Sequence, residues 1–529
     1  MTSVGGIHMR NRTLTTAIVV ASASLVAGLA PAAVAATPAA PATPAKPVTA
    51  VKAAKPGKPA KPAQPVSDFN ADGYRDLVIQ QAGSFMDSRP GSVVVLYGSK
   101  TGVSVANRQI IDQDTPGVPG TSENSDRFGG QAIVGDYDGD GITDLAISAD
   151  GEDMSFGSVY RRNAGQITIV WGGKKGLTRH GGTTLKQTVP TAIDIRRGYA
   201  VVGGDFNGDG ITDLATNDRT PGRGGDVLYG PVSRKTGAPK SIAATNPRPD
   251  RIAGVSVRAS GDMTGDGIAD LVVHSTYDRG PGQKYHGQVE LWPGTKKGLT
   301  VGTALKGADG KTFLAGSGNN VAVGDLDRDG HADLAVGGYL PGGTPDTAGH
   351  VQIVYGGPTG QSTTRAPQMI TQDTPGVPDE HEVDDYFGTS VSIGDINADG
   401  YGDLAVGAAG ESFERAAEAG QVTTLPGGPN GVTGEGARAY NRGTPGVPES
   451  LTAHDYLGTA VKLVDLNGDQ RDDLAIATNG GDEVHEGRVN ILFNDGRGAI
   501  TGYGSHAYYA HNLGLTGGHR SGFGDGFGG

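Results

Sequence analysis

One ten-residue pattern, D-x-[D/N/T]-x-D-G-x-x-D-L, occurs seven times along this chain of 529 residues, with one departure at its glycine. The copies begin at Asp68, Asp136, Asp205, Asp262, Asp325, Asp395 and Asp465. Self-similarity at a nearly fixed period is typical of repeat architectures, and this period is too long for most solenoid repeats. It suits a four-stranded propeller blade with generous loops. The repeat therefore predicts an all-β, seven-bladed β-propeller over residues 67–529.

The stretches around each copy repeat too, and they have the apolar alternation and glycine punctuation of strands. An apolar stretch, often led by Phe-Gly as at Phe128-Gly129 and Phe387-Gly388 and more weakly by Leu457-Gly458, comes before the loop. A short alternating stretch follows it, and then a third strand that ends in a turn. A Gly-Leu or Gly-Val pair is expected to start the fourth strand, at Gly176-Leu177, Gly298-Leu299 and Gly431-Val432.

Positions 1, 3, 5 and 9 of the pattern carry side-chain oxygens, the hard donors that Ca²⁺ prefers, and position 7 adds a backbone carbonyl. Glycine at position 6 permits the sharp turn of the backbone. The sequence thus predicts a calcium-binding hairpin loop in each blade and up to seven structural Ca²⁺ ions. The expected ligands are Asp68, Asn70, Asp72, Asp76, Asp136, Asp138, Asp140, Asp144, Asp205, Asn207, Asp209, Asp213, Asp262, Thr264, Asp266, Asp270, Asp325, Asp327, Asp329, Asp333, Asp395, Asn397, Asp399, Asp403, Asp465, Asn467, Asp469 and Asp473.

An EF-hand shares the first half of this pattern, but it has Glu at position 12 and leads into a helix. Here position 12 is Ile, Val or Thr in every copy, and the flanks are strand-like. An array of EF-hands is therefore excluded. Two copies depart from the pattern, because Thr264 is a weaker neutral donor and Gln470 replaces the glycine. We expect those two sites to bind most weakly or to stay empty.

The charge balance favours bound cations. Residues 1–66 carry seven Lys or Arg and no acid, so residues 67–529 hold 44 − 7 = 37 bases against 57 acids, a net charge of −20. The loop positions account for 23 of those acids. Carboxylates that lie close together repel one another unless they are neutralised, and seven divalent cations would leave about −6. The alternative is that the aspartates are ordinary turn formers.

The chain begins with features of export. Residues 1–35 combine Arg10 and Arg12, an apolar run and the small-x-small site Ala33-Val34-Ala35, which predicts a secretory signal peptide. A membrane anchor is the alternative, but the run is short and rich in small residues, so we expect no transmembrane segment. Residues 36–66 are rich in Pro, Ala and Lys and cannot form a core, which predicts a disordered linker. Its lysines either contact an anionic cell envelope or belong to a plain spacer.

The chain ends with a Phe-Gly stretch, Phe523-Gly524, that has no calcium loop behind it, whereas the first loop lacks a Phe-Gly strand before it. We therefore expect the C-terminal tail to complete the first blade, which would leave no open edge at the seam. The alternative is a disordered glycine-rich tail. The absence of cysteine rules out disulfides, so a secreted fold of this size must be stabilised by its core or by metals.

The loops and Phe-Gly strands, clearest from Phe128 to Leu145 and from Phe387 to Leu404 with five weaker copies, resemble the FG-GAP repeat family, which also forms the N-terminal propeller of integrin α subunits. The resemblance covers residues 67–529 and implies calcium loops between the first two strands of each blade. Only some integrin blades carry the loop, and no leg domains follow here, so an integrin-like receptor is not implied. Related propellers occur as secreted bacterial proteins, lectins and an appendage of glycosylphosphatidylinositol-specific phospholipase D, so the fold alone leaves the function open.

Strand order places the calcium loops and the three-to-four turns on one face of the ring. The two-to-three and blade-to-blade connections then lie on the other face, where variable loops favour binding. Those connections include three copies of Thr-Pro-Gly-Val-Pro, at 115–119, 374–378 and 444–448, and the aromatic residues Phe156, Tyr160, Tyr277, Tyr285, Tyr339 and Phe413. Each of these aromatic residues is either a binding contact or a packed loop residue.

The sequence lacks the G-x-S-x-G and H-E-x-x-H signatures and any thiol, and aspartates that hold calcium are poor acid–base groups. An acidic domain without a basic stripe argues against nucleic-acid binding. We therefore expect a secreted, monomeric, calcium-stabilised adhesion or binding propeller, extracellular or cell-wall associated, that recognises an extracellular protein or glycan. The alternative is a secreted esterase-like or phospholipase-like hydrolase on the same scaffold.

Overall fold

The computed structural model describes residues 67–82, 90–177, 181–186, 194–217, 224–244, 252–277, 286–313, 320–338, 348–478, 487–515 and 522–529, without the side chains of 252, 253, 277 and 286. The chain divides into two compact units, Met1–Lys61 and Pro62–Gly529, and all described residues belong to the second. The expected signal peptide and linker lie outside the described residues and stay predictions.

The described residues form seven four-stranded antiparallel sheets, which we number as blades 1 to 7. Blade 1 contains β1 (Leu77–Gln81), β2 (Ser92–Leu96), β3 (Arg108–Ile111) and β32 (Phe523–Phe527). Blade 2 contains β4 (Phe128–Gly135), β5 (Asp144–Ala149), β8 (Gln166–Val170) and β9 (Gly182–Thr184). Blade 3 contains β10 (Ala200–Gly204), β11 (Asp213–Asn217), β12 (Asp226–Tyr229) and β13 (Ser241–Ala244). Blade 4 contains β14 (Ile252–Gly261), β15 (Asp270–Tyr277), β16 (His286–Trp292) and β17 (Thr303–Ala304).

The remaining blades follow the same order. Blade 5 contains β18 (Val321–Gly324), β19 (Asp333–Gly338), β20 (His350–Val354) and β23 (Gln368–Ile370). Blade 6 contains β24 (Phe387–Gly394), β25 (Asp403–Ala408), β26 (Gln421–Leu425) and β27 (Arg438–Tyr440). Blade 7 contains β28 (Ala460–Val464), β29 (Asp473–Thr478), β30 (Arg488–Leu492) and β31 (His506–Tyr509). Shorter elements outside the blades are the ribbons β6 (Met154–Phe156) with β7 (Val159–Arg161) and β21 (Gly356–Gly357) with β22 (Gly360–Gln361), and the 3₁₀ turns η1 (Val105–Asn107) and η2 (His511–Leu513).

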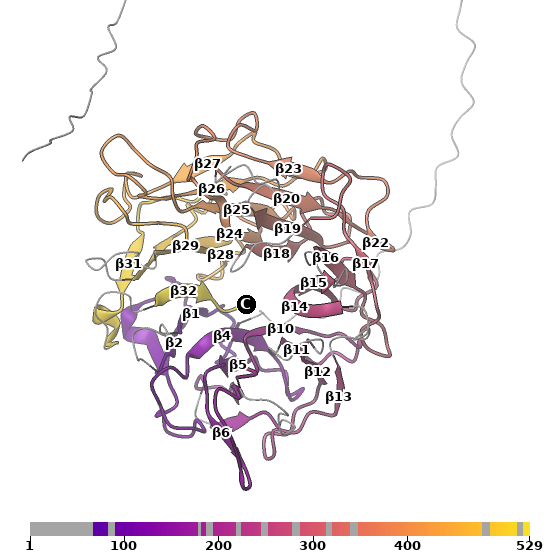
Figure 1. Cartoon of the computed structure of the whole chain (residues 1–529). Coiled ribbons are helices and arrows are strands. Elements are labelled where there is room, and N and C mark those ends of the chain that lie inside the picture. The colour runs from indigo at the N-terminus through magenta and orange to yellow at the C-terminus, as the bar shows by residue number, and fades with distance from the viewer. Residues whose placement is uncertain are drawn as a thin grey trace, which may run out of the picture. The chain divides into compact units, whose positions relative to one another are not determined.

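The seven sheets stand around a common axis, each with its first strand innermost, as Figure 1 shows. Blade 1 differs only in that its innermost strand comes from the C-terminal end of the chain. The innermost strands surround a cavity of about 600 Å³ on this axis, into which Arg258 and Lys462 also face. The prediction of an all-β, seven-bladed propeller is confirmed.

The second strand of each blade explains why the blades stack. In six blades it begins at the position-9 aspartate of the pattern and continues as an apolar run, and every residue of β5, β25 and β29 is buried. Both faces of such a strand pack against neighbouring sheets, so the core lies between blades. One cluster, for example, joins Ala405 and Val422 of blade 6 to Leu474 and Ile476 of blade 7.

The Phe-Gly pair lets the first strand approach the preceding blade. The Phe128 and Phe387 side chains are buried, and Gly129 and Gly388 have φ values of +92° and +95°. A Cβ on Gly129 would lie 2.4 Å from the Ser92 carbonyl oxygen of blade 1. Only glycine adopts this conformation and this close contact without strain.

The ring closes through blade 1. In Figure 1, yellow β32 lies beside indigo β1, and the two strands pair with Ile79 opposite Phe527 and Gln81 opposite Phe523. The Phe523 side chain is fully buried between blades 7 and 1. Nearby, the Ser99 N–H of blade 1 donates to the Leu466 carbonyl of blade 7 over 3.3 Å. The tail thus supplies the edge that β1 would otherwise expose.

The Gly-Leu and Gly-Val pairs do not start the fourth strands, so that prediction was wrong. Gly176-Leu177, for example, lies in the turn before β9, where the Leu177 N–H donates to the Tyr97 hydroxyl over 3.0 Å. A Cβ on Gly176 would lie 2.2 Å from the same hydroxyl oxygen. The pair is therefore a docking point for a tyrosine of the preceding blade, and the glycine makes room for it.

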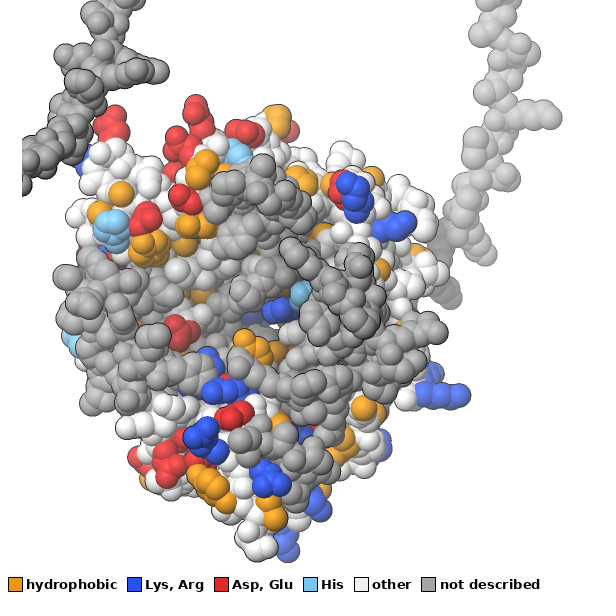
Figure 2. Space-filling view, in the orientation of Figure 1, with side chains coloured by type: hydrophobic (Ala, Val, Ile, Leu, Met, Phe, Trp, Pro, Cys, Tyr) orange, Lys and Arg blue, Asp and Glu red, His pale blue; other side chains and the backbone are white. Residues whose placement is uncertain are grey.

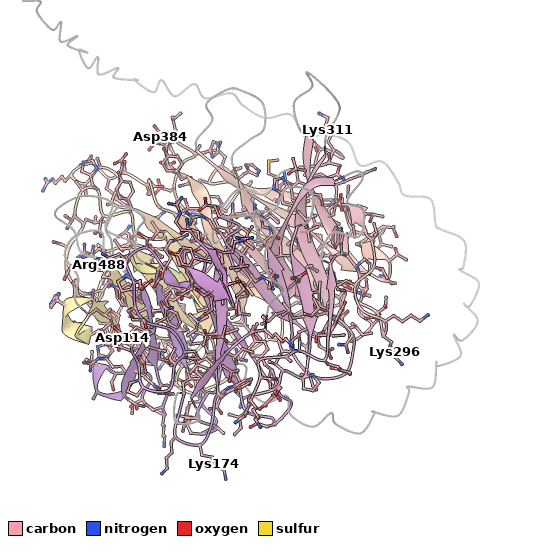
Figure 3. The ribbon with its side chains drawn as sticks, turned by 60° about the horizontal axis from the view of Figure 1, so that its bottom comes forward. Asp114, Lys174, Lys296, Lys311, Asp384 and Arg488 are labelled. Atoms are coloured by element: carbon pink, nitrogen blue, oxygen red, sulfur yellow. The ribbon has the colours of Figure 1, made fainter. Side chains whose placement is uncertain are left out.

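Strand order gives the ring two faces. The one-to-two loops and three-to-four turns form the loop face, and the two-to-three and blade-to-blade connections form the connection face. Figure 3 shows Lys174 and Lys296, from three-to-four turns, at one end of the blades and Asp384 and Lys311, from blade-to-blade connections, at the other.

Candidate metal centres

The seven repeated loops share one backbone arrangement on the loop face. In loop 2, the Asp140 and Gly141 N–H groups donate to the two carboxylate oxygens of Asp136 over 3.2 and 2.8 Å, and the Ile142 N–H donates to Asp140 over 2.9 Å. The same bonds occur in the other six loops. Position 1 therefore folds the loop by accepting its backbone N–H groups, as aspartate does in turns.

The aspartate at position 9 ties each loop to the end of the third strand. Asp144 accepts the Tyr137 N–H over 3.1 Å and the Gly172 N–H over 2.7 Å, and its side chain is fully buried. Equivalent bonds hold the position-9 aspartate in five of the other loops. In loop 4 the Gly294 N–H donates in the same way, but the second donor is the N–H of Thr264 at position 3 instead of position 2. A carboxylate has about four acceptor sites, so two backbone bonds leave capacity for a cation.

Burial disfavours the charge on these carboxylates. Desolvation raises the pKa of Asp76 and Asp144 to about 8 and the pKa of Asp213, Asp333, Asp403 and Asp473 to about 7, and it also raises the pKa of Asp270. A nearby divalent cation favours the ionised form of a carboxylate and lowers its pKa. The position-9 side chains thus fit a cation chemically.

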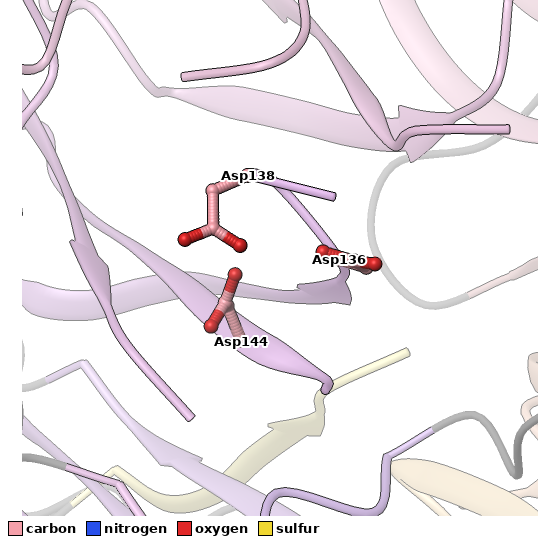
Figure 4. A group of neighbouring side chains, drawn as sticks. All are labelled: Asp136, Asp138 and Asp144. Atoms are coloured by element: carbon pink, nitrogen blue, oxygen red, sulfur yellow. The ribbon is translucent and has the colours of Figure 1, made fainter. Parts of the chain in front are cut away.

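Two loops bring three carboxylates to one point. Oxygens of Asp136, Asp138 and Asp144 lie within 4.8 Å of one another, and so do those of Asp325, Asp327 and Asp333. Figure 4 shows the Asp138 and Asp144 carboxylates facing each other with Asp136 beside them. These are the two loops with aspartate at position 3, where the others carry the neutral donors Asn70, Asn207, Thr264, Asn397 and Asn467.

The same two loops each contact an arginine that sequence reasoning missed. Arg234 pairs with Asp138 and, over 2.6 Å, with Asp140, and Arg365 pairs with Asp327 over 2.9 Å. Counted over the ligand positions and the contacting arginine alone, the formal charge is −3, the same as that of the three ligand aspartates in each remaining loop. Lys240 also reaches Asp209 of loop 3, but its side chain is 61% exposed, so solvent screens that pair.

The two departures keep the common backbone. Gln470 has φ = +68°, close to that of the glycines it replaces, and its N–H donates to Asp465 over 2.9 Å. Thr264 donates its N–H and its hydroxyl to Asp270 over 2.9 and 3.4 Å. Both loops keep the position-1 bonds, but in loop 4 the N–H that binds the position-9 aspartate shifts from position 2 to position 3. Weak occupancy of these two sites stays a prediction.

Neighbouring loops are joined through their backbones. The Asp136 carbonyl accepts the Thr212 N–H of the next loop over 2.9 Å, and the same bond runs from Ala269 to Asp205, Ala332 to Asp262, Gly402 to Asp325 and Asp472 to Asp395. Ordering one loop therefore supports the next. The structure gathers the predicted side chains of each loop into one hairpin, and their oxygen-only chemistry suits Ca²⁺.

Comparison with known proteins agrees with this geometry. A family model described as FG-GAP repeat matches residues 128–170, 317–354 and 387–425, which include the first three strands of blades 2, 5 and 6. The chain carries FG-GAP repeats. Among the described residues, the blades outside the matched segments are also four-stranded and carry the same loop pattern.

The relatives that match are much longer than the aligned region. Phosphatidylinositol-glycan-specific phospholipase D of Bos taurus is 31% identical over 150 residues, which cover 28% of this chain and 17% of that protein. Integrin alpha-V of Gallus gallus is 33% identical over 221 residues, or 40% of this chain and 20% of that protein. The FG-GAP chain thus matches about a fifth of the length of these curated relatives.

A solved structure of the rhamnogalacturonan lyase YesW aligns with 73% of this chain and 75% of its own, at 13% identity and a TM-score of 0.31, too low to relate the two folds. None of the described residues forms a helix with the length and hydropathy needed to span a bilayer.

Proposed function

We propose that this protein is a secreted, calcium-stabilised binding propeller that recognises an extracellular protein or glycan through its connection face. The predicted signal peptide supports secretion, and the likeness to the propeller region of an integrin alpha chain supports a binding role. In this proposal, calcium occupies the loop face and holds the scaffold, while the other face makes the contacts.

A structural role for calcium follows from the repetition of the loops. The loops recur in all seven blades with the same bonds to the position-1 aspartate, whereas a catalytic site is normally unique. Each supplies four side-chain oxygens and a carbonyl, which leaves little coordination capacity for a substrate. Position 9 also ties each loop to the rest of its blade, so a bound ion would strengthen contacts that the fold already makes.

The observation that carries the binding role is the exposure of apolar side chains on the connection face. Tyr160 in the β6–β7 ribbon is 60% exposed, Tyr199 is 44% exposed and Val383 is 68% exposed. Figure 1 shows this ribbon projecting from blade 2. An aromatic side chain on a protruding ribbon offers a large contact area at low entropic cost. Of the other aromatic residues expected here, Phe156 and Phe413 are half-buried, and the Tyr277 side chain, Tyr285 and Tyr339 lie outside the described residues.

The test applies the purified protein to a glycan array and to immobilised extracellular-matrix proteins in calcium. We expect a hit, and we expect Tyr160→Ala to weaken it at least tenfold. Tyr503→Ala is the matched control, because Tyr503 is 72% exposed but lies in a three-to-four turn on the loop face. Equal losses from both variants, or no hit on either array, would contradict the proposal. A screen of ester and phosphodiester substrates on the same preparation tests the hydrolase alternative, and turnover there would favour it.

A further inference from the structure

Three blade-to-blade connections share the sequence Thr-Pro-Gly-Val-Pro and run the same course over the connection face. They lead into blades 2, 6 and 7, and each ends with an aspartate two residues before the Phe-Gly or Leu-Gly pair, namely Asp126, Asp385 and Asp455. In blade 6 the Gly410 N–H of the two-to-three connection donates to the Asp385 carbonyl over 3.0 Å. The two kinds of connection therefore meet at this aspartate.

An acidic cluster lies at the meeting point in blade 6. Oxygens of Glu382, Asp385 and Glu411 lie within 4.8 Å of one another, and Asp385 and Glu411 are 2% and 1% exposed. Asp379 and His381 also act on this cluster, but no lysine or arginine among the described residues forms an ion pair with its three acids. Three carboxylates at such spacing repel one another unless a proton or a metal cation lies between them.

A buried glutamine amide beside the acidic cluster has an oxygen without a hydrogen-bond partner. Gln372 is 1% exposed, and its Nε2 donates to Glu411 Oε2 over 2.6 Å, yet its Oε1 is buried without a hydrogen-bond partner. Buried polar atoms are rarely left unpaired, and an ordered water or a bound ion is the usual partner. Blade 2 repeats the arrangement, because Gln113 donates to Glu152 over 2.5 Å and its Oε1 also lacks a partner. The amide oxygen and the carboxylates are all hard oxygen donors.

In blade 7 the position equivalent to Gln372 is occupied by an arginine, so the positive charge comes from the protein itself. Arg442 stands where Gln372 stands in blade 6, two residues before the shared threonine. Its guanidinium pairs with Asp455, the equivalent of Asp385, over 2.7 Å, and Arg488 pairs with the same carboxylate. All three residues are at most 5% exposed. In blade 7 a guanidinium cation therefore neutralises the buried aspartate of the connection.

From these contacts we propose that the cluster of Gln372, Glu382, Asp385 and Glu411 binds a divalent cation such as Ca²⁺, on the face opposite the repeated loops. The ion takes the place that the guanidinium of Arg442 fills in blade 7. Glu382 is exposed, so the site opens to solvent. Figure 2 shows acidic side chains on the upper rim of this face, over β23 and β27, and the neighbouring Asp384 lies at that end of the blades in Figure 3. The bound ion clamps two connections of the proposed binding face together.

Native mass spectrometry in Ca²⁺ tests this site, because it counts bound ions as integers. We expect Asp385→Asn to carry one Ca²⁺ fewer than the parent. Asp455→Asn is the matched control, since it removes the equivalent carboxylate from a site that an arginine fills, and it should keep the parent's count. A parent-like count for Asp385→Asn, or an equal loss from both variants, would overturn the proposal.

A second variant keeps the test independent of folding defects. Gln372→Arg reproduces blade 7 in blade 6, and we expect it to fold, to lose one Ca²⁺ and to melt at a higher temperature than the parent in chelator. An unchanged ion count in Gln372→Arg would show that no metal uses this site. Both variants leave the loop residues unchanged. Failure of the connection-face site in this test would therefore not count against calcium binding by the loops, and the two outcomes can be told apart.

Discussion

The two faces of the propeller are built in opposite ways. On the loop face, seven ten-residue loops share the bonds to the position-1 aspartate and offer side-chain oxygens as ligands. On the connection face, an equivalent position can change its chemistry, as Gln372 of blade 6 and Arg442 of blade 7 show, and one connection is extended by the β6–β7 ribbon. The uniform face holds the blades together, and the varied face has the freedom to acquire contacts.

Uniformity on the loop face extends to charge. Loops 2 and 5 carry an extra aspartate at position 3, and each also contacts an arginine that offsets the added formal charge at the ligand positions. This compensation of the added aspartate charge is consistent with every loop binding the same divalent ion. The two faces therefore predict different responses to calcium removal, to ligand mutation and to backbone strain.

Removal of calcium should have the largest effect. An ion held at about 100 times its dissociation constant stabilises the folded state by about 2.7 kcal/mol, and several loops contribute. We expect EDTA to lower the melting temperature by more than about 10 °C, by calorimetry or circular dichroism. Readdition of Ca²⁺ should restore the original value, whereas NaCl at equal ionic strength should not. Superimposed melting curves in Ca²⁺ and in EDTA would refute the metal assignment on the loop face.

A matched pair in loop 6 separates the framework from the ligands. Asp403 is buried and accepts the Ile396 and Gly427 N–H groups, each over 2.9 Å, whereas Asp399 is exposed. Asp403→Ala leaves two buried donors unpaired, at about 1–3 kcal/mol each, so its loss of stability should persist in EDTA. Asp399→Ala should lower stability chiefly in Ca²⁺. Chemical denaturation of both variants in both buffers gives the comparison, and equal losses in EDTA would remove the distinction between positions 5 and 9.

The fold could be predicted because the number of repeats gives the number of blades and the repeat length fits four strands. The loop pattern marks each hairpin, and the alternating run after Asp144 or Asp403 marks the second strand. The Gly-Leu pairs were misassigned because glycine beside an apolar residue also occurs at strand starts. Their actual partner, such as Tyr97 for Leu177, lies 80 residues away, and no local pattern reveals it.

The ligand side chains of the loops could also be predicted from the sequence, because each set lies within nine consecutive residues. Arg234 was missed because it contacts Asp138 across 96 positions, from a turn of the next blade. The cluster around Glu411 was missed because Gln372, Asp385 and Glu411 come from separate stretches of two connections. Contacts that depend on how the blades pack against one another cannot be predicted from the sequence of a single segment.

The smallest expected effect concerns the one loop that breaks the pattern. Gln470 has φ = +68°, a left-handed conformation that costs a residue with a side chain about 1–2 kcal/mol. Gln470→Gly removes this strain but adds about 0.5–1 kcal/mol of chain entropy lost on folding, so a net gain of about 0.5–1 kcal/mol remains. Gly330→Gln in loop 5 is the reverse exchange, and a Cβ there meets nothing within 4 Å, so only the backbone term changes. We expect urea denaturation in Ca²⁺ to show shifts of opposite sign for the two variants, because the same strain is removed from one loop and added to another. Shifts of the same sign would mean that side-chain contacts of Gln470, rather than its backbone, set the stability of loop 7.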